Sequence, residues 1–299
     1  MDLASLAVFR TVAQQQSVTR AAEMLGRVPS NVTTRIQQLE AEIGVPLFQR
    51  YKKRMALTAE GTAYLDYADR ILNLAEEAQQ VVSPSGPAGV LRVGSMEATI
   101  ATRLPVPLAR FNETWPQVTI DLSTAPTRPL IESLLARRID CALIAVPEGD
   151  WWLSSDEIHK VPVFREELVL VLPPGHPDVH RADDIKPWSL AAFGLGCTYR
   201  MLAEEWVRGF GTRPTQLRIQ EIKSYHAMIA YTAAGSCFSV LPRSVLDLVP
   251  DASEFTVRTL AVVDTYLASR PGFATPAFNE FRTTLAAFSN IETDVHAPA

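Results

Sequence analysis

Short polar side chains open an amphipathic stretch near residue 30, and this pattern suits the recognition of base edges in DNA. Four apolar residues there recur at steps of four, three and four, which places them on one stripe of a helix: Val32, Ile36, Leu39 and Ile43. Polar residues face away from that stripe or flank it: Ser30, Asn31, Thr33, Thr34 and Gln38. An asparagine can pair bidentately with adenine in the major groove, and hydroxyls can reach bases or phosphates. From periodicity alone, a helix hairpin with a solvated face explains the pattern equally well.

Cations and further hydroxyls flank this stretch at positions suited to phosphate contact. Ser17, Thr19 and Arg20 lie at the start of a preceding short helical segment, whose positive end can bind phosphate. After the amphipathic stretch, four cations fall within five residues, and we expect them to form a wing along the DNA backbone: Arg50, Lys52, Lys53 and Arg54. Pro29, at the expected start of the amphipathic helix, and Arg35 complete the set of candidate DNA-contacting residues.

The segment after the wing predicts one long helix. Thr58 is a suitable N-cap, and no proline follows it before residue 82. Apolar residues recur along the segment in a heptad-like series: Tyr64, Ala68, Ile71, Ala75, Ala78 and Val82. One helix cannot bury both this seam and its other apolar residues, Leu65 and Leu72, on its own head. We therefore expect pairing with a second copy of the chain, and packing against the C-terminal region is the alternative.

Charge is distributed unevenly along the 299 residues. The net charge of −5 would by itself argue against a nucleic-acid partner. Residues 1–58, however, hold eight basic and four acidic side chains, whereas residues 59–82 hold one basic and five acidic. A protein that presents one face to phosphates requires such a concentration of positive charge at one end.

Cysteine content and hydropathy predict the compartment. Three scattered cysteines, Cys141, Cys197 and Cys237, are too few for a disulfide framework and favour a reducing compartment. No signal peptide and no membrane-spanning run are apparent. We expect a cytoplasmic protein with no membrane association.

The region after residue 82 indicates a second architecture. Residues 83–89 are rich in proline, glycine and serine, which is typical of a hinge. Strands are then expected at 90–94, 118–122, 141–146, 168–172, 194–197, 217–222, 238–241 and 262–268. Helices are expected between and after them at 99–111, 128–138, 200–210, 224–234 and 275–290. This alternation predicts α/β units with parallel sheets.

The N-terminal 61 residues resemble the LysR-type transcriptional regulators. The shared landmarks, in order, are Leu6, Phe9, 17–22, Leu25, 32–39, Glu40, 44–48, Arg50 and 57–61. The family joins such a head to an effector-binding domain of the length seen here, so the resemblance covers essentially all 299 residues. Many members have arginine where Thr34 stands, with Arg35 one place later here, and this departure leaves the base preference of this chain undefined.

The resemblance implies a DNA-binding regulator and not an enzyme. The implied domains are an all-α winged helix-turn-helix head over 1–58, a dimerisation helix over 59–82, the hinge over 83–89 and an α/β effector domain over 90–299. The effector domain would have the two-lobed fold of periplasmic solute-binding proteins, with lobe I at 90–163 and 267–299 and lobe II at 164–266. The resemblance also implies dimers on a quasi-palindromic operator in double-stranded DNA, tetramers, and contact with RNA polymerase.

An effector would bind at the carboxyl ends of the strands, where helix N-termini point amides into the space between the lobes. The candidate residues, which match the family's effector pocket, are Ser95, Met96, Glu97, Ala98, Thr99, Thr124, Arg128, Ala145, Val146, Cys197, Thr198, Tyr199, Arg200, Ser224, Tyr225 and His226. Ser95, Thr99 and Thr198 would donate hydrogen bonds, and Arg128 or Arg200 would supply a counter-charge, which favours a small anion or carboxylate. Glu97 favours a ligand that also has a donor or an amine.

Other functions fit the sequence less well. The sequence contains no GxSxG, P-loop, GxGxxG or HExxH motif. His176 and His180 are four residues apart, but Pro177 between them indicates a turn, so no metal site and no cofactor are expected. A solute-binding protein for a transporter would have a signal peptide and no DNA head. Thiol redox sensing through Cys197 and Cys237 remains an alternative form of control, although buried cysteines usually act as small apolar residues.

Overall fold

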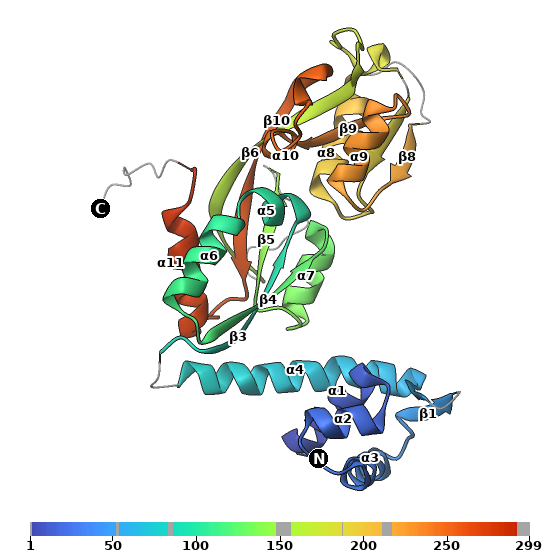
Figure 1. Ribbon diagram of the computed structural model, residues 1–299, viewed down its shortest axis with the longest axis vertical. Coiled ribbons are helices and arrows are strands. Elements are labelled where there is room, and N and C mark those ends of the chain that lie inside the picture. The colour runs from blue at the N-terminus through green and yellow to red at the C-terminus, as the bar shows by residue number, and fades with distance from the viewer. Residues whose placement is uncertain are drawn as a thin grey trace. The chain divides into compact units, whose positions relative to one another are not determined.

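The computed structural model describes residues 2–51, 54–82, 86–147, 157–186, 188–210 and 217–291. The chain divides into two compact units (Figure 1). One unit comprises residues 1–83 with 136–138, and the other comprises residues 84–135 and 139–299.

The N-terminal unit is a helical head with a two-stranded wing and a long helix. Its elements are α1 (Leu3–Gln15), α2 (Val18–Met24), α3 (Pro29–Ile43), β1 (Phe48–Tyr51), β2 (Arg54–Leu57) and α4 (Ala59–Val81). β1 and β2 pair antiparallel, with Phe48 opposite Leu57. The helix expected to begin near Pro29 does so, because proline is tolerated at the first helical position, where its missing N–H has no intrahelical partner.

Aromatic packing joins α1 to the wing and to α4. The buried ring of Phe9 lies 5.2 Å from that of Phe48 and 5.4 Å from that of Tyr64, measured between centroids. Val32 and Ile36 on α3 are buried in the same core, as the helical periodicity predicts. One side of α3 is therefore packed in the core of the head, and the opposite side is exposed.

Hydrogen bonds from the wing to the helices of the head hold both of its strands. At its start, the Glu40 carboxylate accepts from the backbone N–H groups of Leu47 at 2.7 Å and Phe48 at 3.0 Å. In β2, the N–H of Met55 donates to the carbonyl of Gln16 at the end of α1, at 3.0 Å. The start of β1 is therefore positioned by α3, and β2 is positioned by α1.

Helix α4 begins as predicted, but its apolar seam differs in part from the predicted one. The Thr58 hydroxyl accepts from Gly61 N–H at 2.8 Å, and the helix continues to Val81. Ala68, a member of the expected seam, is buried in the head core together with Leu72. Of the other expected members, Ile71, Ala78 and Val82 are exposed, and Tyr64 and Ala75 are half-buried. The exposed apolar row consists of Tyr67, Ile71, Leu74, Ala78 and Val81. The prediction of Ala68 as a pairing residue was therefore wrong, because the head itself covers it.

The second unit, which we call the effector unit after the domain that the resemblance implies, contains one mixed sheet with helices on both faces (Figure 1). Its strands are β3 (Gly89–Ser95), β4 (Val118–Thr124), β5 (Cys141–Val146), β6 (His159–Pro174), β7 (Ser189–Ala192), β8 (Arg218–Glu221), β9 (Phe238–Pro242) and β10 (Phe255–Ser269). Its helices are α5 (Glu97–Thr102), α6 (Pro105–Thr114), α7 (Thr127–Leu135), α8 (Thr198–Phe210), α9 (Tyr225–Ala233), α10 (Arg243–Leu246) and α11 (Pro276–Ala287), with 3-10 turns η1 (Ala182–Asp184) and η2 (Ala252–Glu254).

Two long antiparallel strands connect the two halves of this sheet. The strand order is β4-β3-β5-β10-β6-β9-β7-β8. The end of β10, Asp264–Ser269, pairs with β5, while Leu168–Val171 of β6 pairs with β9. We use lobe I for β3–β5 with α5–α7 and α11, and lobe II for β7–β9 with α8–α10; β6 and β10 run through both. The two-lobed α/β architecture predicted from the sequence is confirmed.

Several expected elements differ from those observed. The strand predicted at 194–197 was wrong; Ser189–Ala192 forms β7, and residues 194–197 form the turn before α8. The helix predicted at 99–111 is divided into α5 and α6, because Pro105 starts a new helix. The strands at 168–172 and 262–268 were predicted too short, since β6 and β10 each extend across the lobe crossing.

Candidate functional site

The exposed side of α3 presents the polar residues expected to meet DNA. Ser30, Asn31, Thr34 and Gln38 are exposed, and Thr33 is half-buried. Thr33 and Thr34 each donate a hydroxyl hydrogen bond, at 3.0 Å, to the carbonyl four residues earlier. Each hydroxyl oxygen can still accept a hydrogen bond at the helix surface. The face can therefore offer amide and hydroxyl groups to a nucleic acid.

Arg35 has a partner inside the head. Its guanidinium donates to Asp2 at 2.8 Å and to the Ser5 hydroxyl at 3.2 Å. Asp2 is also the N-cap of α1, where it accepts from Ser5 N–H at 2.7 Å. The bonds from Ser5, assisted by Arg35, hold the pKa of Asp2 below its ordinary value. These bonds join α3 to α1, and the contact of Arg35 with DNA stays a prediction.

The candidate phosphate contacts lie at the start of α2 and on the wing. Ser17 caps α2, its hydroxyl accepting from Arg20 N–H at 3.4 Å, and the side chains of Thr19 and Arg20 are exposed. Arg54 is exposed at the start of β2. Lys52 and Lys53, and the side chain of Arg50, lie outside the described residues.

In the effector unit, a buried hydroxyl network joins the two lobes. Thr198, the first residue of α8, donates from its hydroxyl to the carbonyl of Ala145 at 2.8 Å. The same hydroxyl lies 3.0 Å from that of Thr127, at the start of α7. The sulfur of Met96 accepts from Ala145 N–H at 3.3 Å and lies 3.5 Å from the Thr127 hydroxyl. The sequence identified Met96, Ala145 and Thr198, but it did not identify Thr127.

Glu97 extends from lobe I toward the start of α9 in lobe II. Its carboxylate accepts a long hydrogen bond, 3.4 Å, from the backbone N–H of Tyr225. Burial raises the pKa of Glu97, and the Tyr225 bond opposes that rise. Within the described ranges this carboxylate makes no ion pair, in contrast to Glu166 nearby.

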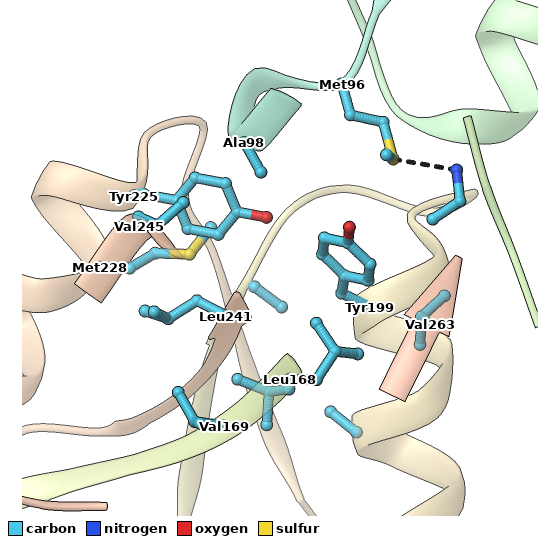
Figure 2. Close-up of a cluster of buried hydrophobic side chains, with 14 of the residues drawn as sticks. Met96, Ala98, Leu168, Val169, Tyr199, Tyr225, Met228, Leu241, Val245 and Val263 are labelled. Carbon is cyan, nitrogen blue, oxygen red and sulfur yellow. Dashed lines mark hydrogen bonds between the residues drawn. The ribbon is translucent and has the colours of Figure 1, made fainter. Parts of the chain in front are cut away.

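Two buried tyrosines lie beneath α5. The hydroxyl of Tyr199 points toward Met96, and the hydroxyl of Tyr225 points toward the helix start at Ala98 (Figure 2). The ring of Phe193 packs edge-on against that of Tyr225, with centroids 4.9 Å apart. Burial raises the pKa of both tyrosines, and the nearby Glu166 and Cys197 add to the rise. Both hydroxyls therefore stay protonated and can donate or accept hydrogen bonds.

An ion pair that the sequence did not reveal connects α5 to the crossing strand β6. Arg103, which follows α5, donates from Nε to the buried carboxylate of Glu166. The other oxygen of Glu166 accepts from the Ser244 hydroxyl of α10 at 2.8 Å. An acidic residue within the apolar run of β6 was the available signal, because a buried charge requires a partner.

The two arginines expected as counter-charges are engaged elsewhere. Arg200 donates to Glu204 at 2.7 Å and to the carbonyl of Phe193 at 3.2 Å. Arg128 is 70% exposed and lies 3.5 Å from Glu132 on its own helix. Among the other candidates, Thr124 and His226 are exposed, Ser224 is half-buried, and Ser95, Ala98, Thr99 and Val146 are buried.

Comparison with known proteins identifies the family. Residues 84–289 match the family described as the LysR substrate binding domain, and residues 3–62 match the bacterial regulatory helix-turn-helix proteins of the lysR family. The chain belongs to the LysR family of transcriptional regulators. This confirms the family, the two-part fold and the regulatory function predicted from the sequence, and family members of this kind are regulators and not enzymes.

Individual relatives extend over most of the chain. The HTH-type transcriptional regulator GltR of Bacillus subtilis (strain 168) is 32% identical over 95% of each chain. The uncharacterised regulator YusT of the same organism is 40% identical over 82% of this chain and 80% of its own. A full-length variant of OxyR from Pseudomonas aeruginosa has a similar fold, with a TM-score of 0.71 at 24% identity, covering 97% of this chain and 96% of its own.

The cysteines of this LysR-family protein are unbridged thiols. Cys141 and Cys237 are buried, and Cys197 is half-buried before α8. Burial raises the pKa of Cys197 even though the N–H groups of Arg200 and Tyr199 donate to its sulfur. A raised pKa disfavours the reactive thiolate, so the geometry gives the redox alternative no support.

Neither a metal-binding cluster nor a membrane-spanning helix occurs among the described residues. No group of three or more His, Cys, Asp and Glu side chains comes together there to hold a metal ion. In the same part of the chain, none of the helices combines the length and apolar character needed to cross a bilayer.

Proposed function

We propose that this LysR-family regulator reads double-stranded DNA through the exposed start of α3. The observation that carries the proposal is that Ser30, Asn31 and Thr34 are exposed on a helix whose opposite side is buried in the head. Such a helix can enter the major groove without rearranging the head. Ser17, Thr19, Arg20 and Arg54, with the other wing cations, would contact phosphates and set the position of α3 along the duplex. Asn31 would be the principal base-reading residue.

We further propose that the protein is a homodimer paired through α4. Tyr67, Ile71, Leu74, Ala78 and Val81 are spaced by four, three, four and three residues, and all are exposed in the single chain. A heptad row of this kind buries its apolar surface against a second helix. A two-fold pair of heads would read two inverted half-sites, hence a quasi-palindromic operator.

We propose residues 1–58, 59–82, 83–89 and 90–299 as the functional divisions of the chain, with lobe I at 90–163 and 267–299. A small-molecule effector would bind between the lobes near Met96, Glu97, Thr198, Tyr199 and Tyr225. The change in the lobes would be passed on through a tetramer of paired dimers to RNA polymerase. Because its target is the chromosome, we place the protein in the cytoplasm. We propose that the assembly exists in two forms and that the effector changes the equilibrium between them. This requires the effector to bind the two forms with different affinity.

Footprinting of the full-length protein on promoter fragments upstream of its own gene and of the neighbouring genes tests the DNA proposal. At low ionic strength we expect two protected half-sites related by two-fold symmetry. Failure to bind any of these fragments contradicts the proposal.

The dimer is tested by size measurement in solution. Leu74→Glu places a charge in the exposed row and should give a monomer, whereas Leu248→Glu, an exposed leucine in the effector unit, should leave the assembly unchanged. A Leu74→Glu protein that remains dimeric would exclude pairing through this row.

A further inference from the structure

We propose that the effector is a small organic cation, with an ammonium group bound by Glu97 and a polar remainder bound by the hydroxyls of Tyr199 and Thr265. The inference rests on the proposed effector site between the lobes and specifies the chemistry of its ligand. It departs from the small anion or carboxylate that the sequence favours.

The first observation is a carboxylate without a cation. Glu97 is half-buried at the start of α5 and receives only the 3.4 Å bond from Tyr225 N–H, which is longer than a strong charge-assisted bond. A carboxylate in such surroundings is stabilised by a cationic partner, and no described side chain provides one. A ligand ammonium group would supply both the charge and the donors.

The second observation is a pair of buried hydroxyls without hydrogen bonds. Tyr199 is 2% exposed and Thr265 is 1% exposed, and neither hydroxyl has a hydrogen-bond partner among the described residues. They come from different elements, α8 and β10; the Thr265 hydroxyl lies close enough to that of Tyr199 to lower the tyrosine's pKa, but the two do not meet at full hydrogen-bonding geometry. Buried polar groups are nearly always hydrogen-bonded, so two such hydroxyls together indicate that a polar atom from elsewhere completes them. A hydroxyl group on the ligand could do so, since it both donates and accepts.

The third observation is the sign of the local charge. Arg103 is neutralised by Glu166, and Arg200 and Arg128 are paired with Glu204 and Glu132. Glu97 is then the uncompensated charge among these groups. An anionic ligand would lose its hydration beside a carboxylate without gaining a counter-charge, whereas a cation would gain one.

Calorimetric titration of the dialysed full-length protein with matched compounds tests the proposal. Ethanolamine is compared with glycolate, and tyramine with para-hydroxyphenylacetate; within each pair the hydroxyl end is kept and the charge changes sign. We expect binding of at least one amine and of neither anion. Glu97→Gln, which removes the charge and keeps the shape, should weaken amine binding about tenfold or more. Glu132→Gln, on an exposed carboxylate of α7, should leave it unchanged.

Three results would overturn the proposal: binding of an anion in preference to its matched amine, amine binding that is unaffected by Glu97→Gln, or no binding of either amine. Tyr199→Phe provides a second variant and should also weaken the binding of whichever amine binds. Operator binding by the same preparations separates this outcome from failure of the proposed function. Preparations that bind the operator but no amine refute the cationic effector alone.

Discussion

Arg103 and Glu166 form an ion pair between the end of α5 in lobe I and the crossing strand β6. Glu166 is almost fully buried, and it also accepts a hydrogen bond from Ser244 in lobe II. One carboxylate therefore contacts both lobes at the point where the chain passes between them.

Glu166→Gln should destabilise the effector unit. The substitution keeps the shape of the side chain but leaves the Arg103 guanidinium without its counter-charge. Removal of one partner of a buried pair typically costs 3–5 kcal/mol, and we expect roughly 3 kcal/mol because Arg103 retains some exposure. Denaturant unfolding of the full-length protein measures the loss. Glu113→Gln, which breaks the exposed pair with Arg110, should change stability by no more than about 0.5 kcal/mol; equal losses would contradict the role given to Glu166.

Gly61→Ala should destabilise the head. A Cβ at this position would lie 2.0 Å from the carbonyl oxygen of Leu47, which is backbone at the start of the wing. Either α4 or the wing must shift, at a cost of about 1–3 kcal/mol. Gly209, in the last turn of α8, has open space where a Cβ would lie, so Gly209→Ala should be neutral or slightly stabilising. Thermal unfolding gives the midpoint temperature of each variant. Similar midpoints for Gly61→Ala and Gly209→Ala would show that the close approach at Gly61 does not limit the size of the side chain there.

Tyr199→Phe should stabilise the protein in the absence of a ligand. The substitution removes a buried hydroxyl that has no hydrogen-bond partner in the described part of the chain, and with it a desolvation penalty. We expect a gain of about 1 kcal/mol in the free energy of unfolding of the dialysed protein. Tyr231→Phe, at an exposed tyrosine of α9, provides the control and should be close to neutral. A loss of stability in Tyr199→Phe would mean that the hydroxyl is already satisfied.

The stability of the ligand-free protein should carry a pH-dependent contribution from Glu97. Because burial raises its pKa above the ordinary value of 4.5, the folded state holds the proton at a pH where the unfolded chain has lost it. This contribution is present at low pH and is lost as the pH rises from about 4.5 through the raised pKa of the folded state. Glu97→Gln lacks it, so the stability of the variant relative to the wild type should increase with pH over that range. Paired unfolding measurements across the range check this, with Glu132→Gln as the control; a constant difference would be incompatible with the assigned burial.

Two head variants should separate base reading from phosphate contact. Asn31→Ala should cost ~1–3 kcal/mol at particular base pairs and relax specificity there. Arg20→Ala should weaken binding to all DNA sequences about equally. It should also reduce the magnitude of the slope of log K against log salt concentration by roughly 1. Anisotropy titrations over a set of operator variants and salt concentrations measure both effects. Unchanged base preference in Asn31→Ala would remove this residue from the recognition surface.

The sequence predicts the head more accurately than the effector unit, and the reason is local. Periodicity and caps define α3 and α4, since Pro29 and Thr58 act on the residues next to them. By contrast, β7 and the turn before α8 both lie in one apolar, glycine-containing run, where strand and turn cannot be distinguished without the neighbouring strands. The full lengths of β6 and β10 also depend on their pairing with each other.

The sequence locates several candidate site residues at strand ends and helix starts because these positions can be recognised from the pattern. The partners of its side chains could not be predicted. Arg103 and Glu166 are 63 residues apart, and Thr198 lies 71 residues from Thr127. Arg35 was a candidate DNA contact and Arg200 a candidate effector contact because of the helices on which they lie. The structure gives them Asp2 and Glu204 as partners, and these partners depend on side-chain direction.

The extended pairing of β6 with β10 determines how one lobe can rotate relative to the other. Their register runs from Phe255 opposite Pro174 to Ser269 opposite His159, so the lobes are joined by a hydrogen-bonded ribbon. A rotation of one lobe against the other must twist this ribbon, since both of its strands pass through the crossing. The paired strands should therefore resist this rotation elastically. When a bound effector dissociates, the lobes would return to the orientation that they have in the ligand-free protein.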